Sequence, residues 1–325
     1  MGSQKMKLAL LTSGGDAPGM NAAIRAVVRM GIARGFEVVG IQAGYNGLLA
    51  EQFQIMGPRD VSNIIQRGGT ILKTSRSPEF NTAAGVRKAA AILERHQIQG
   101  LVIIGGDGSF RGGEDLAKVW KGQIIGVPGT IDNDLFGTDF TIGFDTAVET
   151  ALEAIDKIRD TAESHERFFL VEVMGRHSGF IALSVAIASG AEEVILPERK
   201  SDIRAICKRL CEGERRGKTS SIIVVAEGCD GGAIHVAEEL KRLSRHQYRV
   251  AILGYLQRGG APATGDRILA SKLGAYAVEM FAEGKSRVMV GEVGGKLVCT
   301  PLRDTFRKKK RLNPDLLRIH KPLSA

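Results

Sequence analysis

Short apolar runs followed by glycine-rich polar turns and then helices recur along nearly the whole chain. Residues 101–104 (LVII) are wholly apolar, and the turn 105–109 (GGDGS) follows them directly. A fully apolar run of this length is typical of a parallel strand that is buried on both faces. Alternating strands and helices predict an α/β fold with mostly parallel sheets and right-handed crossovers. The predicted strands are 7–11, 37–41, 101–104, 124–127, 168–173, 192–196, 221–226 and 249–253, and the predicted helices are 21–33, 60–66, 84–96, 113–120, 146–163, 180–189, 202–214, 234–243 and 266–282.

The length of the chain and the places of its polar turns predict two lobes. The chain has 325 residues, which favours about two domains. Its 41 glycines are dispersed among the strand ends, where tight turns and close backbone approach require them. Ligands of open α/β sheets bind outside the carboxyl ends of the strands. We therefore expect two doubly wound, Rossmann-like lobes with mostly parallel sheets and an active site in the cleft between them.

Composition and charge leave several classes of anionic partner open. The formal net charge is +9 and the isoelectric point about 9.5, which favours phosphorylated metabolites, nucleic acid or an acidic membrane. The basic run 307–311 (RKKKR) is typical of a solvated surface, and the 5% aromatic content argues against nucleic acid. No apolar run approaches membrane-spanning length, and the N-terminus lacks the apolar core of a signal peptide. The four cysteines form no metal-binding pattern, so a reducing cytoplasm is expected.

The turn 128–134 (PGTIDND) is the strongest single candidate for chemistry. It follows the predicted strand 124–127, so Asp132 and Asp134 arrive at the carboxyl end of a buried strand. Two carboxylates at i and i+2 in a low-dielectric cleft disfavour each other's ionisation, which raises the pKa of one of them. A general base that acts near neutral pH needs such a pKa. Taken alone, however, the motif favours an ordinary surface Asn-Asp turn.

Two further turns are suited to binding phosphate. Residues 12–16 (TSGGD) and the turn 105–109 each join a strand to a helix, an arrangement that presents backbone N–H groups to an anion. Asp107 is placed to hold Mg²⁺ directly or through water. Arg76 lies in a hydroxyl-rich loop and is a candidate phosphate contact. Similar GGDG turns occur in NAD kinases and lipid kinases, so this motif indicates a kinase without naming its substrate.

Seven motifs taken together resemble those of bacterial-type ATP-dependent 6-phosphofructokinases, in the order of that family and over essentially the whole chain. They are TSGGDAPGMNAAIR (12–25), RGGT (67–70), GGDGS (105–109), PGTIDND (128–134), TIGFDTA (141–147), MGR (174–176) and QRGG (257–260). The resemblance implies transfer of the ATP γ-phosphoryl group to the C1 hydroxyl of fructose 6-phosphate, with Mg²⁺ as cofactor.

The resemblance also implies a role for individual residues. Asp132 is then the base for the sugar hydroxyl, and Asp107 holds the metal. The other implied catalytic residues are Thr130, Asp134, Arg76 and Arg176. The implied ATP contacts are Gly15, Tyr45, Arg76, Gly108, Ser109 and Gly112. The implied sugar-phosphate contacts are Thr130, Asp132, Arg167, Met174, Gly175, Arg176, Glu227, Arg249, Tyr255 and Arg258.

The family further implies an assembly and an effector site. Arg167 and Arg249 enter the active site from a neighbouring subunit in the family, which implies a homotetramer. The implied ATP lobe comprises residues 1–143 and 257–308, and the implied fructose 6-phosphate lobe comprises 144–256 and 309–325. Nucleotide or phosphoenolpyruvate effectors are expected at a separate anion site. Its implied cations are Arg25, Arg29, Arg159, Arg216 and Lys218, and Gly190 and Glu192 are implied to hold the effector's metal.

Some positions depart from the family pattern or bear on alternatives. Tyr255 replaces a common His in the 6-phosphate site, and Pro58 and Thr219 replace an Arg and a Lys of the effector site. Gly108 and Gly129 favour ATP, because pyrophosphate-using relatives typically have Asp and Lys there. A pyrophosphate-dependent phosphofructokinase, another GGDG kinase and a non-catalytic protein that binds anions or nucleic acid remain the alternatives.

Overall fold

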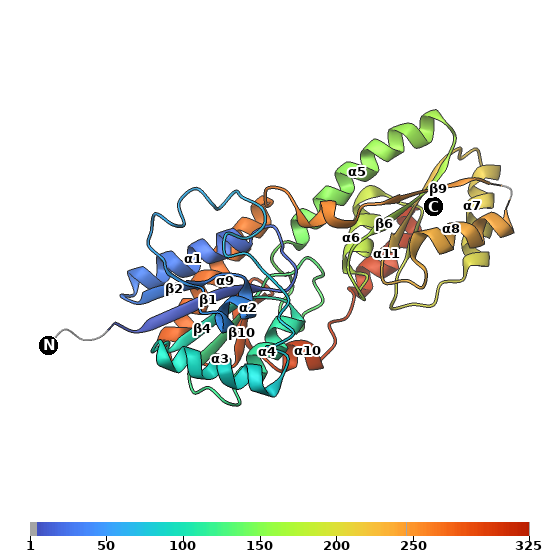
Figure 1. Ribbon diagram of the computed structural model, residues 1–325. Helices are drawn as coiled ribbons and strands as arrows, with labels where there is room; N and C mark the ends of the chain where they lie inside the picture. Colours follow the sequence, from blue (N-terminus) through green and yellow to red (C-terminus); the bar gives the residue numbers. More distant parts are fainter. Residues whose placement is uncertain (1–4, 245, 325) are drawn as a thin grey trace. The chain divides into compact units, whose positions relative to one another are not determined.

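The computed structural model describes residues 5–244 and 246–324, and the chain divides into two compact units (Figure 1). Unit 1 consists of Met1–Ile131, Leu135–Asp145 and Arg258–Lys310. Unit 2 consists of Asp132–Asp134, Thr146–Gln257 and Arg311–Ala325. Each unit has its own sheet, so the expected α/β fold with two mostly parallel sheets is confirmed.

In the described residues, unit 1 contains a seven-stranded sheet with the order β11-β10-β5-β4-β1-β2-β3. The neighbouring strands from β10 to β2 pair in parallel, and the edge strands β3 and β11 pair antiparallel. The strands are β1 (Lys7–Ser13), β2 (Glu37–Ile41), β3 (Phe53–Ile55), β4 (Gly100–Gly105), β5 (Gln123–Pro128), β10 (Val288–Val293) and β11 (Lys296–Pro301).

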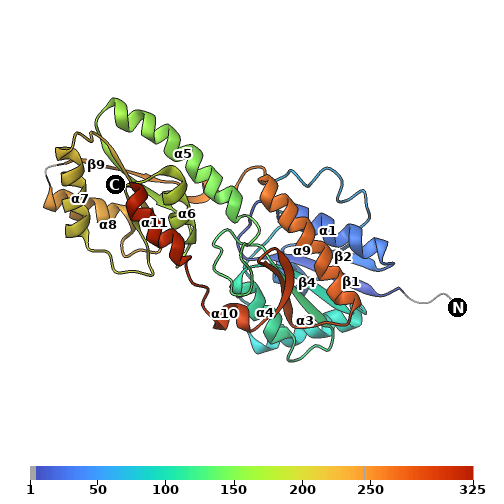
Figure 2. The same cartoon turned by 180° about the vertical axis from the view of Figure 1, so that it is seen from behind.

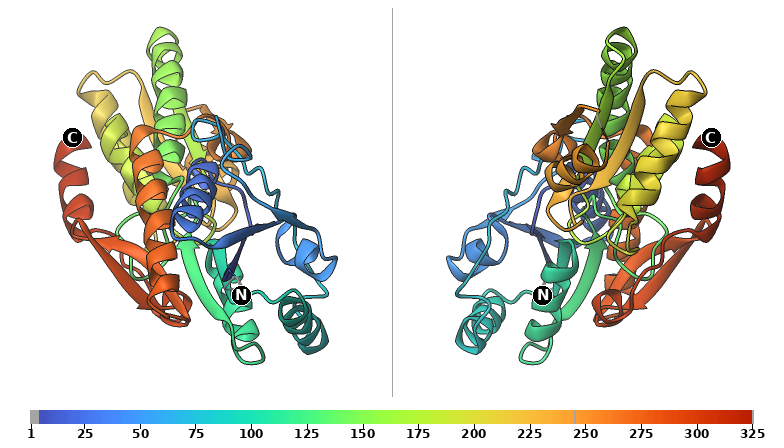
Figure 3. Two further views of the ribbon diagram at one scale, coloured as in Figure 1. Left: turned by 90° about the vertical axis from the view of Figure 1, so that its left-hand side faces the viewer. Right: turned by 90° about the vertical axis from the view of Figure 1, so that its right-hand side faces the viewer.

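Helices cover both faces of this sheet, as Figures 1 and 2 show. α1 and α9 pack side by side on one face, and Figure 3 shows this pair in blue and orange. Side chains from α2, α3 and α4 form one buried cluster with alternate residues of β1, β2 and β4 on the other face. The helices are α1 (Met20–Ala33), α2 (Gly44–Leu49), α3 (Ala83–Arg95), α4 (Asp107–Leu116), α9 (Thr264–Ala282) and α10 (Asp304–Arg307).

Unit 2 has a parallel sheet with the order β7-β8-β6-β9. Apolar side chains of α7 and α8 pack on one face of it, and α6 packs against α11. The strands are β6 (Phe168–Val173), β7 (Glu193–Ile195), β8 (Ser221–Ala226) and β9 (Tyr248–Ile252). The helices are α5 (Phe144–Ser164), α6 (Phe180–Ser189), α7 (Ile203–Arg215), α8 (Gly232–Leu243), α11 (Pro314–Ser324) and a 3₁₀ segment, Gly254–Arg258. Among the described residues, no helix has both the length and the apolar character needed to cross a membrane.

The structure corrects two of the predicted helices. Residues 60–66 form successive turns instead of a helix, and Asn63 has the left-handed φ of 54°. Val61 and Ile64 in this loop are nevertheless buried. The helix predicted over 113–120 begins six residues earlier, at Asp107, and ends at Leu116. Asp107 is favourable in a first turn because its negative charge is attracted to the positive end of the helix dipole.

Candidate functional site

The three glycine-rich turns of unit 1 lie at one edge of its sheet. Ser13 of β1 is in register with Gly105 of β4, and Gly105 is in register with Pro128 of β5. The turns that follow these three adjacent parallel strands therefore begin at the same level of the sheet. The Gly129 N–H donates to the Gly105 carbonyl over 3.0 Å, which extends this alignment by one residue. This edge brings together the turns that the sequence assigns to phosphate, metal and catalysis.

The first turn approaches an arginine closely. A Cβ at Gly15 would lie 1.9 Å from Nη1 of Arg258, so the guanidinium rests directly on the backbone of the turn. Gly14 has a φ of 89°, which favours glycine. The Thr74 hydroxyl donates to the Gly14 carbonyl over 2.7 Å. The structure thus places Gly15 and Arg258 together, although the family assigns them to different substrates.

The second turn combines an accessible backbone with a buried hydroxyl. Gly108 faces open space, since a Cβ there would meet no atom within 4 Å. The neighbouring Ser109 is 4% exposed, and its Oγ has no hydrogen-bond partner in the part of the chain that the structure describes. A buried hydroxyl without a partner costs free energy of about 1–3 kcal/mol, which a ligand that bonds to it would recover. Both features suit a bound phosphate.

Tyr45 and Gly112 belong to the packing that supports this turn. The Tyr45 hydroxyl donates to the Ser109 carbonyl over 2.7 Å, and its ring stacks on Phe80 at 3.9 Å. A Cβ at Gly112 would come within 2.9 Å of Phe80, so glycine is needed for this packing. Burial, reinforced by the nearby Asp115, raises the pKa of Tyr45, and its hydroxyl therefore stays a neutral donor.

Asp107 offers one carboxylate to a metal. Its side chain is 33% exposed, and its Oδ1 accepts the Gly108 N–H over 2.6 Å. No group of three or more His, Cys, Asp or Glu residues suited to a metal occurs among the described residues. Mg²⁺ commonly takes one or two carboxylates and fills its other positions with water and substrate phosphates. Asp107 beside the open Gly108 fits a magnesium ion that arrives with a nucleotide.

The PGTIDND turn joins the two units. Thr130 follows β5 in unit 1, and its carbonyl accepts the Thr141 hydroxyl over 2.6 Å. Asp132 and Asp134 belong to unit 2, and both are half-buried. The Ser178 hydroxyl donates to the Asp132 carbonyl over 3.2 Å. This bond holds the backbone of Asp132, the residue whose carboxylate is the candidate general base.

A strained turn presents Arg176 after β6. Gly175 and Arg176 have φ values of 145° and 56°, and left-handed backbone at a non-glycine residue costs free energy. Oε1 of Glu227 accepts both of their N–H groups, over 3.1 and 2.6 Å. The preceding Met174 N–H donates to Oε1 of the fully buried Gln257 over 2.8 Å. Sequence reasoning assigned Glu227 to the sugar and missed Gln257, although the quoted QRGG motif contains it.

Removal of the Glu227 carboxylate is expected to destabilise this turn. Glu227→Ala leaves two N–H groups without their acceptor and should lower the free energy of unfolding by about 1–3 kcal/mol. Glu227→Gln keeps an acceptor oxygen and should lower the free energy of unfolding by less. Urea denaturation followed by circular dichroism measures both, with the exposed Glu153→Ala as a control expected within about 0.5 kcal/mol of the wild type. Equal stabilities for Glu227→Ala and Glu153→Ala would contradict the assignment.

The two arginines that are predicted to enter the active site of a neighbouring subunit line the same cavity in unit 2. Arg167 precedes β6 and Arg249 lies on β9. Both line a cavity of about 310 Å³ together with His246 and Lys218. Tyr255 is 81% exposed, so its phenol is accessible to a ligand or a partner chain.

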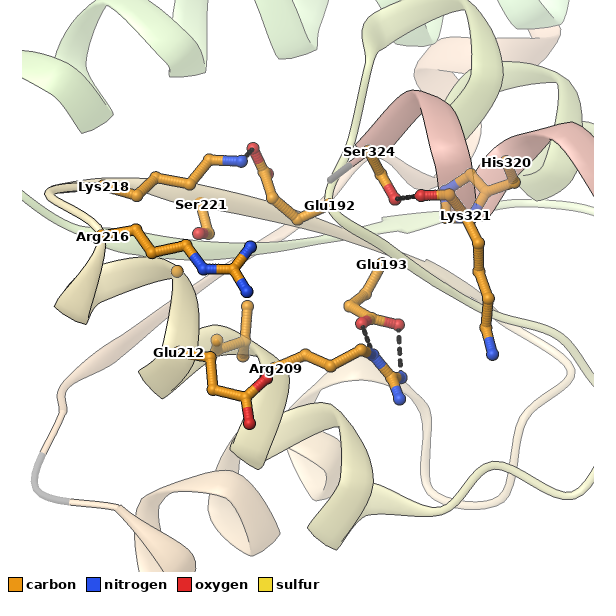
Figure 4. A pocket seen from close by; sticks show the side chains of 12 residues that line it. Glu192, Glu193, Arg209, Glu212, Arg216, Lys218, Ser221, His320, Lys321 and Ser324 are labelled. Atoms are coloured by element: carbon orange, nitrogen blue, oxygen red, sulfur yellow. Dashed lines mark hydrogen bonds and ion pairs between the residues drawn. The ribbon is translucent and has the colours of Figure 1, made fainter.

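The predicted effector residues fall on both units. Arg25 and Arg29 lie on α1 of unit 1. In unit 2, Glu192, Arg216 and Lys218 line a cavity of about 490 Å³, which also receives residues of α11 (Figure 4).

Two contacts shape this effector region of unit 2. Glu192 and Lys218 form an ion pair of 2.8 Å. Arg159 donates to the carbonyl of Ser189, beside the left-handed Gly190, over 2.7 Å.

The chain matches the phosphofructokinase family model over residues 7–281. The chain belongs to the phosphofructokinase family. It is 56% identical over 319 residues to the ATP-dependent 6-phosphofructokinase 1 of Thermus thermophilus, covering 98% of this chain and 99% of the relative. It is 51% identical to the ATP-dependent 6-phosphofructokinase of Cytophaga hutchinsonii, covering 98% of both chains.

Solved structures of phosphofructokinases have the same fold. The Saccharomyces cerevisiae phosphofructokinase superposes with a TM-score of 0.87 at 37% identity. The match covers 98% of this chain, which spans about half (48%) of the yeast chain. A pyrophosphate-dependent phosphofructokinase from Marinobacter aquaeolei superposes with a TM-score of 0.85 at 24% identity, covering 98% of this chain and 92% of the other. The latter similarity is informative about the fold alone.

Proposed function

We propose that the chain is an ATP-dependent 6-phosphofructokinase, which transfers the γ-phosphoryl group of ATP to the C1 hydroxyl of fructose 6-phosphate. The products are fructose 1,6-bisphosphate and ADP, so the enzyme would act in glycolysis. The observation that carries the proposal is the 56% identity, over nearly the full length of both chains, to a relative of that name. The open Gly108 and the Asp107 carboxylate beside it support a nucleotide as the donor.

In the proposed mechanism, Asp132 accepts the proton of the C1 hydroxyl as the oxygen attacks the γ-phosphorus. A bond forms between the C1 oxygen and the γ-phosphorus, and the bond from the γ-phosphorus to its bridging oxygen breaks, which releases ADP. Arg176 and Arg76 stabilise charge on the transferring group, and Thr130 and Asp134 support the base. Bound Mg²⁺ would neutralise phosphate charge, and Asp107 is the residue that would hold it.

The remaining binding roles follow the same assignment. Unit 1 would bind ATP through Gly15, Tyr45, Arg76, Gly108, Ser109 and Gly112. Unit 2 would bind the sugar phosphate through Met174, Gly175 and Glu227, with Tyr255 of that unit and Arg258 of unit 1 at the 6-phosphate. Arg167 and Arg249 would serve a neighbouring subunit in a cytoplasmic homotetramer. Sedimentation at a monomer mass under assay conditions would refute the tetramer.

Effector binding is part of the proposal. ADP or phosphoenolpyruvate would occupy a site that includes Glu192, Arg216 and Lys218. The ion pair between Glu192 and Lys218 keeps the lysine occupied, so an anionic effector must compete with the carboxylate for it. Titration with each effector, measured as a change in the cooperativity of fructose 6-phosphate, tests this site. No change with either effector would refute it.

The deciding experiment is a coupled assay for fructose 1,6-bisphosphate with Mg²⁺ and either ATP or pyrophosphate as donor. Turnover with ATP supports the proposal, and turnover with pyrophosphate alone would replace it by the pyrophosphate-dependent reaction. A panel of NAD and lipid acceptors covers the other GGDG kinases. Absence of turnover with every donor and acceptor would favour a protein that only binds anions.

A negative charge at position 108 is expected to weaken ATP binding. In Gly108→Asp the new carboxylate enters open space, so the fold should persist while the charge repels the nucleotide phosphates. Coulomb repulsion of about 1–4 kcal/mol between charges 4 Å apart corresponds to a KM for ATP raised roughly five- to several-hundredfold. Gly108→Ala is the matched control and should leave the KM within about twofold, since its methyl group meets no atom. An unchanged KM in Gly108→Asp would place the phosphates elsewhere.

A further inference from the structure

The basic run near the end of unit 1 is attached to the body of that unit. Lys308 pairs with Asp304 over 2.9 Å, and its Nζ lies 5.3 Å from the centre of the Phe136 ring. Lys310 donates to the Asp139 carbonyl over 2.7 Å. These contacts hold α10 in place, and α10 packs against α4, the helix that begins with Asp107.

One residue of α10 fixes the side chain of Arg111 on α4. The Arg111 guanidinium lies over the Phe306 ring at 4.4 Å from its centre, and Nη2 lies 3.4 Å from the Phe306 carbonyl oxygen that accepts its hydrogen bond. Phe306 is partly buried against the core cluster of unit 1. A guanidinium that stacks on an aromatic ring and donates to a carbonyl keeps its position better than a free surface cation.

This anchored guanidinium lies beside the candidate metal ligand. Arg111 is one helical turn beyond Asp107, and its Nε lies 3.8 Å from Oδ2 of that carboxylate. The two side chains are 54% and 33% exposed, so solvent weakens their attraction without removing it. A fixed positive charge at this distance repels a bare divalent cation and attracts a polyphosphate.

We propose that Arg111 is a positioning residue that makes Asp107 favour a divalent cation that arrives with the nucleotide phosphates over a bare cation. The proposal rests on the function proposed above and adds a residue to its donor site. The charge of Arg111 lowers the affinity of Asp107 for bare metal. The same charge raises the affinity of the turn for ATP that carries no metal, so the two affinities are coupled with opposite signs.

Two binding measurements test the proposal without turnover. Mn²⁺ binding without nucleotide is followed by electron paramagnetic resonance, and ATP binding in excess EDTA is followed by calorimetry. In Arg111→Met, which keeps an apolar stem on Phe306, we expect Mn²⁺ to bind roughly two- to fivefold more tightly and metal-free ATP to bind weaker by a similar factor. Arg111→Lys keeps the charge and should restore both affinities towards those of the wild type.

Controls separate this effect from general changes in charge or folding. Lys118→Met removes another exposed cation of unit 1, which pairs with Asp115, and should change neither affinity. Asp107→Asn should abolish the Mn²⁺ binding that Arg111→Met strengthens. Unchanged affinities in Arg111→Met, or affinities that both fall, would overturn the proposal. Mn²⁺ binding that Asp107→Asn leaves unchanged would also overturn it. Failure of the proposed function appears separately, as absent turnover of the wild type with ATP.

Discussion

Asp132→Asn is expected to lower kcat by about 10²–10⁴-fold, the usual contribution of a positioned general base. The amide has nearly the shape of the carboxylate but cannot accept the proton of the C1 hydroxyl. The hydrogen bond from Ser178 to the Asp132 carbonyl does not depend on the carboxylate, so it should survive the substitution. The coupled assay with saturating ATP and fructose 6-phosphate measures the loss, and the KM for ATP should change little.

The matched control for this variant is Asp160→Asn. Asp160 is exposed on α5 of the same unit, so its substitution removes an equal charge away from the proposed chemistry. We expect its kcat to stay within about twofold of the wild type. If Asp132→Asn retains wild-type kcat while thermal melting shows both variants folded, another group accepts the proton.

The parallel core was predictable because its strands are buried on both faces. Residues 168–173 were predicted as a strand, and β6 spans those residues. Burial on both faces selects continuous apolar runs, which sequence alone reveals. Strands β10 and β11 were missed, although Gly294 and Gly295 between them are a recognised hairpin signal. The loop around Val61 and Ile64 was wrongly predicted as a helix, because buried apolar residues three apart also occur in loops.

Sequence motifs identified the glycine-rich turns that lie at one edge of the sheet, but not the contacts that support them. The turns after β1, β4 and β5 could be placed at one edge because parallel strands in register must release them together. The bonds from Gly175 and Arg176 to Glu227 could not be foreseen, since they join residues about fifty positions apart. The stacking of Arg111 on Phe306 joins residues 195 positions apart in sequence, and no local pattern encodes it.

The side chain of Arg176 is expected to contribute the largest catalytic effect. Arginines that stabilise the transition state of phosphoryl transfer account for about 10³–10⁵ in rate, and we expect Arg176→Met to lower kcat by a factor in this range. The substitution keeps the backbone N–H that donates to Glu227, so the strained turn should survive it. An interaction made mainly in the transition state lowers kcat and kcat/KM together and leaves the KM values nearly unchanged.

Two further variants decide whether Arg176 acts through its geometry or only through its charge. Arg176→Lys retains the charge but loses the planar fork that binds two phosphate oxygens at once, so only partial recovery of kcat is expected. Arg204→Met removes an exposed cation of α7 in the same unit and should leave kcat unchanged. Full activity in Arg176→Lys would reduce the role of Arg176 to a general electrostatic one. A large rise in KM for fructose 6-phosphate with normal kcat in Arg176→Met would instead assign Arg176 to ground-state binding, because only a contact made equally in both states has that signature.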